Sequence, residues 1–359
     1  MIRALTLLGV FVMNADAIGR EMTAGTGGGV PSAVTAAFAG LLLAGKSRTL
    51  LMVLFGVGAV LLWRHASRAG GSPASLLLRR YVVLFLVFGL AHLAVFPGDI
   101  LTHYALTGLV LLPLLPWLLA GRRWRPLALA AVALTLGSAL DLLGADLSLD
   151  WPGPLHLVGD ALGVFARNGP STLAAFAVGA WLARRPELGG EAGDTAQPRL
   201  ARRLTVTGAV ASVAGTIVST FVDPSSAAEA MHRPAWTVAA GTLATFVMLL
   251  GGALCYFGLA WWLVNRGRVS GRALARLAPL GRLTLTAYLA STAVFTLALK
   301  PFGEQITFSG YFAAGLALFV TFAALAPLWL RHFRLGPAEW LWRRLTYWQP
   351  LPFRRRPAR

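Results

Sequence analysis

The chain has 359 residues, of which 57% are hydrophobic and 13% are charged, and this composition excludes an ordinary soluble globular protein. Its formal net charge of +18 does not indicate nucleic-acid binding, because most basic residues are arginines placed between apolar runs, as in loops that flank membrane helices. A single cysteine excludes an internal disulfide. We therefore expect an all-α, polytopic integral membrane protein whose main partner is the lipid bilayer.

Apolar runs long enough to cross a bilayer recur along the whole chain and predict about ten transmembrane helices. They lie near residues 4–19, 48–63, 80–96, 99–119, 124–144, 168–184, 204–222, 235–263, 279–299 and 310–331. The run at 32–45 is only about 14 residues long, short of the roughly 20 that a span needs, so we expect a re-entrant or interfacial helix there. The first run lacks a small-residue cleavage site, which predicts a membrane segment rather than a signal peptide.

The arginines predict how these spans are oriented. With Arg3 inside, all but six of the 32 basic residues fall in loops on the cytoplasmic side. The six exceptions are Arg20, Lys46, Arg48, Arg167, Arg233 and Lys300. Both termini are therefore expected in the cytoplasm.

One polar, glycine-rich stretch at residues 186–200 is typical of a linker and predicts two halves. We expect an N-terminal transmembrane half at 1–185, a C-terminal transmembrane half at 201–350 and a basic tail at 351–359. Gly9, Gly56, Gly58, Gly251 and Gly252 lie inside apolar runs and predict close packing between helices.

The strongest candidate site surrounds the Pro97-Gly98 turn between the runs 80–96 and 99–119. His92 precedes the turn, and Asp99 and His103 follow it. Ionisable groups at membrane depth are costly and usually functional. If both arms are helical, the two histidines share one level, and Asp99 lies in the first turn of the second helix on the same face as His103. These residues form the predicted catalytic cluster; the alternative is that they only stabilise the hairpin.

Other polar residues are candidates for binding a substrate or an anion. Lys46 and Arg48 lie outside on the predicted topology, against the positive-inside rule, so they either bind an anion or indicate a different local topology. Arg282 either anchors its helix at the membrane surface or holds a phosphate or carboxylate. Tyr104, beside His103, completes the predicted substrate-binding set.

The sequence lacks the signatures of several common enzyme classes. No histidine pair has a tight metal-ligand spacing, so we predict no metal site. No Walker motif, dinucleotide-binding glycine turn or nucleophile elbow is present. Nucleotide hydrolysis and serine-esterase chemistry are therefore unsupported.

Five segments resemble the YeiB-like bacterial inner-membrane proteins, whose C-terminal half is known as domain of unknown function 418. They are RALTLLGVFVMN at 3–14, KSRTLLMVLFGVG at 46–58, HLAVFPGDILTHYALTG at 92–108, GRLTLTAYL at 281–289 and GPAEWLWRRLTY at 336–347. The resemblance runs almost end to end and implies a many-helix protein of the bacterial inner (cytoplasmic) membrane.

That family is distantly similar to the transmembrane acyltransferases of the heparan glucosaminide acetyltransferase type. This resemblance implies transfer of an acyl group from cytosolic acyl-CoA to an extracytoplasmic carbohydrate or lipid-linked acceptor. The first predicted outer loop has no histidine, so His92 is the expected general base or acyl carrier, with Asp99 and His103 positioning it. Acyl-CoA would be the donor substrate, and no resident cofactor is expected. The competing hypothesis is a small-solute or proton-coupled transporter, in which the cluster relays protons.

Overall fold

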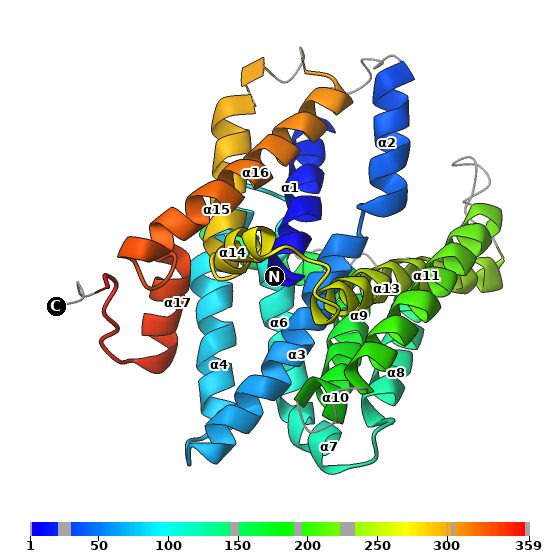
Figure 1. The fold of residues 1–359 in the computed structure, drawn as a ribbon. Coiled ribbons are helices and arrows are strands. Elements are labelled where there is room, and N and C mark those ends of the chain that lie inside the picture. Colours follow the sequence, from blue (N-terminus) through cyan, green and yellow to red (C-terminus); the bar gives the residue numbers. More distant parts are fainter. Residues whose placement is uncertain are drawn as a thin grey trace. The chain divides into compact units, whose positions relative to one another are not determined.

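The computed structural model describes residues 2–20, 30–143, 151–189, 196–222, 234–299, 301–302 and 306–355 (Figure 1). These residues form helices and contain no strand; Phe333 and Arg354 make an isolated β-bridge. The predicted all-α fold is confirmed in this part of the chain.

The predicted apolar runs fall on helices within the described residues. Seven helices are long and apolar enough to cross a membrane, or eight if the bent pair Gly271–Leu280 and Thr284–Leu299 counts as one span. The chain is thus a polytopic membrane protein, and the count of about ten stays a prediction. The difference lies in α1 (Ile2–Arg20), whose apolar part ends at Ala15, and α9 (His156–Ala183), which carries several polar residues.

The chain forms two compact units. Unit 1 contains residues 1–51 and 263–359, and unit 2 contains residues 52–262. The predicted linker at 186–200 falls within unit 2. Its described residues are α10 (Pro186–Gly189) and the beginning of α11 (Ala196–Val222), and residues 190–195 lie outside the described residues. The predicted halves follow chain order, whereas the units follow contacts, so the predicted division stays a prediction.

Unit 1 is built around α1, which packs against α15 (Thr284–Val294) and α16 (Phe308–His332). Its other helices are α2 (Val30–Leu42), the beginning of α3 (Lys46–Arg68), the end of α13 (Ala235–Asn265), α14 (Gly271–Leu280), the π-helix η4 (Phe295–Leu299) and α17 (Pro337–Tyr347). α2 has 13 residues and is separated from α3 by a turn in which Gly45 has a φ of 69°. Its predicted re-entrant or interfacial placement stays a prediction.

Unit 2 is built around α9, which packs against α6 (Leu101–Leu111) and α8 (Arg125–Leu142). Its other elements are most of α3, α4 (Pro73–Val83), η1 (Leu84–Gly89), α5 (Leu90–Leu93), η2 (Leu112–Leu114), α7 (Leu115–Ala120), η3 (Gly153–Leu155), α10, α11 and most of α13.

Glycines allow helices to approach closely inside each unit. A Cβ at Gly56 of α3 would collide with the Phe176 carbonyl of α9, and one at Gly251 of α13 would meet the backbone of α11 at 2.6 Å. In unit 1, a Cβ at Gly9 would collide with Ser47. The predicted packing role of these three glycines is confirmed.

Candidate functional site

The helix that carries His92 contains a π-helical turn. α4, the π-helix η1 and α5 follow one another without a break from Pro73 to Leu93. Within this stretch the Leu90 N–H bonds the carbonyl of Phe85, five residues back. Such a turn inserts one residue into the helical repeat, changes which side chains share a face, and occurs often at functional sites. It lies one helical turn or less before His92.

A tight turn then returns the chain to α6. The Phe96 N–H bonds the His92 carbonyl at 2.8 Å, and the Asp99 N–H bonds the Phe96 carbonyl at 3.1 Å. Gly98 lies against the ring of Phe96, where a Cβ would come within 2.5 Å of a ring carbon. Gly89 similarly faces Thr102, and a Cβ at Gly89 would lie 3.0 Å from the Thr102 methyl carbon. The close approach of the two arms therefore needs glycine at position 89, and the packing of the Phe96 ring within the turn needs glycine at position 98.

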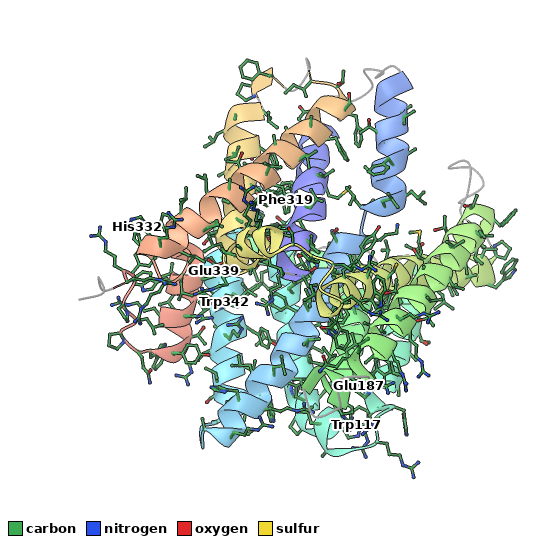
Figure 2. The ribbon with its side chains drawn as sticks, in the orientation of Figure 1. Trp117, Glu187, Phe319, His332, Glu339 and Trp342 are labelled. Carbon is green, nitrogen blue, oxygen red and sulfur yellow. The ribbon has the colours of Figure 1, made fainter. Side chains whose placement is uncertain are left out.

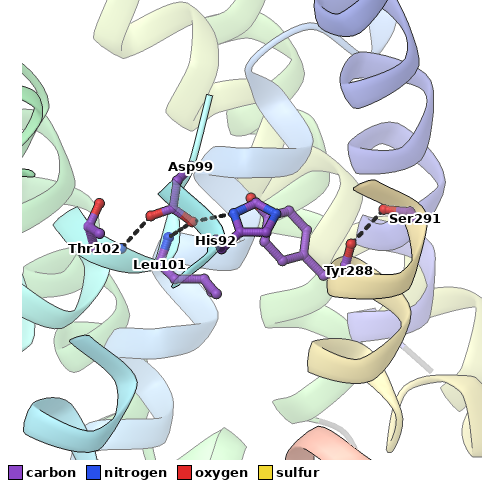
Figure 3. A network of polar contacts seen from close by, with 6 residues as sticks. All are labelled: His92, Asp99, Leu101, Thr102, Tyr288 and Ser291. Atoms are coloured by element: carbon purple, nitrogen blue, oxygen red, sulfur yellow. Dashed lines mark hydrogen bonds and ion pairs between the residues drawn. The ribbon is translucent and has the colours of Figure 1, made fainter. Parts of the chain in front are cut away.

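The turn brings His92 and Asp99 into direct contact (Figure 3). Asp99 Oδ1 accepts hydrogen bonds from His92 Nδ1 at 2.7 Å and from the Leu101 N–H at 3.0 Å. Asp99 Oδ2 accepts one from the Thr102 N–H at 2.7 Å. His92 is 6% exposed and Asp99 2% exposed. The pair is thus buried and geometrically fixed.

These contacts determine the tautomer of His92. Backbone N–H groups only donate, so Asp99 uses its oxygens as acceptors at the N-terminus of α6, where the helix dipole favours a carboxylate. His92 Nδ1 must then carry the proton that it donates to Asp99. In the neutral ring the lone pair is consequently on Nε2, which is the arrangement of a general base oriented by a carboxylate.

The histidine that Asp99 binds directly is His92. The expectation that Asp99 lies in the first turn of the second helix is wrong, because α6 begins at Leu101 and Asp99 belongs to the preceding turn. The ring of His103 is 1% exposed and packs edge-on against Tyr104, with ring centroids 4.9 Å apart. Tyr104 also packs edge-on against Phe55 and Phe176. Roles for His103 in positioning His92 and for Tyr104 in binding substrate stay predictions.

The other predicted binding residues belong to unit 1. Lys46, the first residue of α3, is 3% exposed, and Arg48 is half-buried. Arg282 is exposed and donates a hydrogen bond to the Arg334 carbonyl at 3.0 Å. Their predicted anion-binding roles stay predictions.

A half-buried acid outside the predicted site residues lies in α17. Glu339 Oε1 accepts hydrogen bonds from the N–H groups of Leu285 at 2.6 Å and Thr286 at 3.1 Å, and its Oε2 accepts one from Thr286 Oγ1 at 2.6 Å (Figure 2 labels Glu339). Burial raises the pKa of Glu339, and its hydrogen bonds to Thr286 and Leu285 oppose that rise. Glu339 thus caps the N-terminus of α15 from a different helix.

Two of the family-like sequence segments meet at this cap. Thr286 belongs to GRLTLTAYL and Glu339 to GPAEWLWRRLTY, and the Ala338 N–H also bonds Thr286 Oγ1 at 3.1 Å. The signal for Glu339 in the sequence is an isolated acid within an otherwise basic C-terminal segment. Within the described residues, no three His, Cys, Asp or Glu side chains gather as metal ligands.

Comparison with known proteins finds a family match in the C-terminal part of the chain. The model of the family described as "Protein of unknown function (DUF418)" matches residues 192–349. The C-terminal part of the chain, residues 192–349, is thus of the DUF418 type. The match begins within the predicted linker and covers the C-terminal segments that contain Thr286 and Glu339, but not the His92 hairpin. No solved structure matches the chain significantly.

Proteins similar to this chain occur in several bacteria. An uncharacterized 39.9 kDa protein from the amylase 3′ region of Bacillus acidopullulyticus is 28% identical over 83% of this chain and 79% of its own length. Uncharacterized protein YxaH of Bacillus subtilis (strain 168) is 27% identical over 85% of this chain and 81% of its own. Uncharacterized protein YeiB of Escherichia coli (strain K12) is 32% identical over 27% and 24%. The YeiB-like resemblance is confirmed, and these names carry no activity.

Proposed function

We propose that this protein is a membrane-embedded acyltransferase. It moves an acyl group from cytosolic acyl-CoA to an extracytoplasmic carbohydrate or lipid-linked acceptor. The observation that supports this proposal is the buried His92–Asp99 pair, with the carboxylate fixed by two backbone N–H groups and the imidazole by the carboxylate. A buried histidine oriented in this way is suited to moving a proton during acyl transfer.

His92 is the catalytic residue in the proposed reaction, and Asp99 positions it. His92 Nε2 removes the proton of the acceptor hydroxyl while the hydroxyl oxygen attacks the thioester carbonyl carbon. The carbon–sulfur bond then breaks, and the CoA thiolate takes the proton from Nε2. Asp99 keeps the proton on Nδ1 throughout and stabilises the imidazolium that forms between the two steps. In the acyl-carrier variant of the mechanism, Nε2 attacks the thioester carbon first and the carbon–sulfur bond breaks, which releases the CoA thiolate. The acceptor hydroxyl oxygen then takes the acyl group from Nε2, and the hydroxyl proton passes to the thiolate.

In the proposed reaction the acyl donor is on the cytosolic side of the membrane and the acceptor is on the opposite side. A polytopic membrane protein can contact both. The alternative is a small-solute or proton-coupled transporter, in which the same two ring nitrogens relay protons. Both functions use His92, so loss of function in a His92 variant does not distinguish them. The distinguishing observable is cleavage of the thioester.

The test uses the purified full-length protein in vesicles of a bacterial lipid extract. Acetyl-CoA with a labelled acetyl group is supplied, and released CoA thiol and labelled lipid or carbohydrate are measured. We expect the wild-type protein to release CoA and His92→Ala to lose this release by at least about 100-fold, the usual contribution of a general base. Thiol release no greater than from empty vesicles, together with His92-dependent proton flux, would favour the transporter and reject the acyltransferase.

A further inference from the structure

Five arginines gather at one end of unit 2, where three separate chain segments meet. Arg184 follows the last residue of α9 and donates hydrogen bonds to the carbonyls of Leu118, Gly121 and Arg122, at and just after the end of α7. Arg64 of α3 donates to the Ala183 carbonyl at 3.0 Å, and Arg125 donates to the Trp117 carbonyl at 3.0 Å. We call Arg64, Arg122, Arg123, Arg125 and Arg184 the arginine cluster.

Contacts with the backbone near helix ends explain the positions of three of these arginines. The carbonyls at a helix C-terminus have no partner within the helix and carry partial negative charge, which favours a cation. Arg64 and Arg184 bind carbonyls at the ends of α9 and α7, and Arg125 lies over Gly121, where any Cβ would collide with its guanidinium group. This structural role accounts for Arg64, Arg125 and Arg184.

It does not account for Arg122 and Arg123. Both side chains are exposed in the turn between α7 and α8, and among the described residues the structure records no ion pair or hydrogen bond for either guanidinium group. Arg64, Arg123 and Arg125 all lie close enough to repel the charge of Arg184. The arginine cluster therefore holds several like charges close together, and among the described residues no ion pair is recorded for any of the five.

Two exposed tryptophans lie beside the arginine cluster. Trp117 is 45% exposed and Trp124 is 54% exposed, and the guanidinium carbon of Arg125 lies 5.2 Å from the ring centre of Trp117 (Figure 2 labels Trp117). In membrane proteins, exposed tryptophans concentrate at the level of the lipid headgroups. The guanidinium group of an arginine matches the geometry of two phosphate oxygens and binds them with two parallel hydrogen bonds.

We propose that the arginine cluster is a binding site for a phosphate-bearing anion, with Arg122 and Arg123 as its mobile ligands and Arg125 and Arg184 as its fixed base. Two sources supply this chemistry: the phosphodiester of an anionic phospholipid and soluble phosphate. The exposed tryptophans favour the phospholipid. The proposal concerns an end of unit 2 that carries none of the hairpin residues, and it does not depend on acyl transfer.

The test measures binding to the full-length protein after its lipids have been removed in a neutral detergent. Phosphatidylglycerol, phosphatidylcholine and inorganic phosphate are added separately, and bound lipid is counted by native mass spectrometry while thermal unfolding is followed in parallel. We expect phosphatidylglycerol to bind and to raise the unfolding temperature, because a ligand of the folded state stabilises it. Phosphatidylcholine, whose headgroup has no net charge, should do neither.

The informative variant is Arg122→Gln/Arg123→Gln, which removes two exposed side chains without removing a carbonyl cap. We expect this variant to bind phosphatidylglycerol at least about tenfold more weakly than the wild type does. Loss of a single charge-assisted hydrogen bond is enough to weaken binding by about that factor. The matched control is Arg202→Gln/Arg203→Gln, which removes an equally exposed adjacent pair from α11 of the same unit. It should bind as the wild type does.

The two arms identify the source of the phosphate. Inorganic phosphate would be identified as the ligand, and the site supported, by three results together. Phosphate would raise the unfolding temperature of the wild type, compete with phosphatidylglycerol and have no effect on Arg122→Gln/Arg123→Gln. Protection by phosphatidylglycerol alone would support the phospholipid. Equal binding to the variant, the control and the wild type, or no binding of either anion to the wild type, would overturn the proposal.

Discussion

At the scale of single residues, the hydrogen bond between His92 and Asp99 is the feature on which the proposed chemistry depends. The Asp99 carboxylate already accepts hydrogen bonds from two backbone N–H groups, so the proton between Asp99 and His92 is on His92 Nδ1. Nε2 is then the nitrogen that can accept a proton. The same bond also stabilises the hairpin, because each partner is buried. Catalytic and structural effects of substitutions at His92 must therefore be separated.

Asparagine provides that separation. Histidine Nδ1 and asparagine Nδ2 are both two bonds from Cβ. His92→Asn therefore keeps a hydrogen-bond donor near the position of Nδ1 and lacks Nε2. We expect His92→Ala to lower the free energy of unfolding by about 1–3 kcal/mol, since it removes a donor from buried Asp99. His92→Asn should recover a large part of that loss. Thermal unfolding in detergent checks this, and equal losses for the two variants would show that the bond to Asp99 contributes little to stability.

Sequence patterns predict which residues form this site better than they predict which of these residues are hydrogen-bonded to each other. The turn at Pro97-Gly98 and the cost of burying charge are enough to select His92 and Asp99 together. The spacing of four residues predicts that Asp99 faces His103, and the structure instead places Asp99 before α6, bonded to His92. A helix start two residues later changes the partner, and helix boundaries are the least certain part of a pattern-based prediction.

At the scale of elements, Glu339 joins α17 to α15 by capping it. Burial raises the pKa of Glu339 above its ordinary value of 4.5. A raised pKa in the folded state means that folding favours the protonated acid, so this contribution to stability is complete below pH 4.5 and is lost as the pH rises through the folded pKa. Glu339→Gln keeps an acceptor for the Leu285 and Thr286 N–H groups and does not titrate.

The stability difference between the wild type and Glu339→Gln should therefore change in favour of the variant as the pH rises from below 4.5 toward neutrality. Unfolding midpoints of both proteins in one detergent over this range measure it. Glu339→Ala serves as the second comparison and should lose about 1–2 kcal/mol, as loss of a helix cap usually does. A change in favour of the wild type with rising pH would mean that the hydrogen bonds outweigh burial.

The close approach of α3 to α9 gives a second prediction for elements. A Cβ at Gly56 would collide with the Phe176 carbonyl, and a backbone atom cannot move aside as a side chain can. We expect Gly56→Ala to force the two helices apart and to destabilise the protein by about 1–3 kcal/mol. Gly40→Ala is the matched control, because Gly40 also lies in a helix and nothing lies within 4 Å of its Cβ position. It should be neutral or slightly stabilising.

Sequence patterns predict elements well and their internal irregularities poorly. The period and length of the apolar runs are enough to place the helices, because a membrane allows few other structures. The π-turn before His92 and the cap that Glu339 provides for α15 depend on contacts between segments distant in the chain or on one inserted residue. No local pattern encodes them, so the sequence alone does not predict them.

At the scale of the whole molecule, the arginine distribution predicts which loops share a side of the membrane. Three loops assigned to one side by this rule contain Arg64, Arg123 and Arg184, which lie together at one end of unit 2. We expect reporters fused after Arg68 and Arg123 to give the same, cytoplasmic, signal. Reporters near Asp150 and Glu229, which lie outside the described residues, should give the opposite signal. Opposite signals from Arg68 and Arg123 would contradict the topology.

The activity of His92→Asn tests the proposed function most directly, because this variant is expected to keep the contact with Asp99 and to lose Nε2. CoA release from acetyl-CoA is measured for the wild type, His92→Asn and Asp99→Asn at matched amounts of folded protein. We predict a loss of at least about 100-fold for His92→Asn at near wild-type stability, and a substantial loss for Asp99→Asn. Wild-type CoA release by His92→Asn would contradict the proposal that His92 performs the acyl transfer.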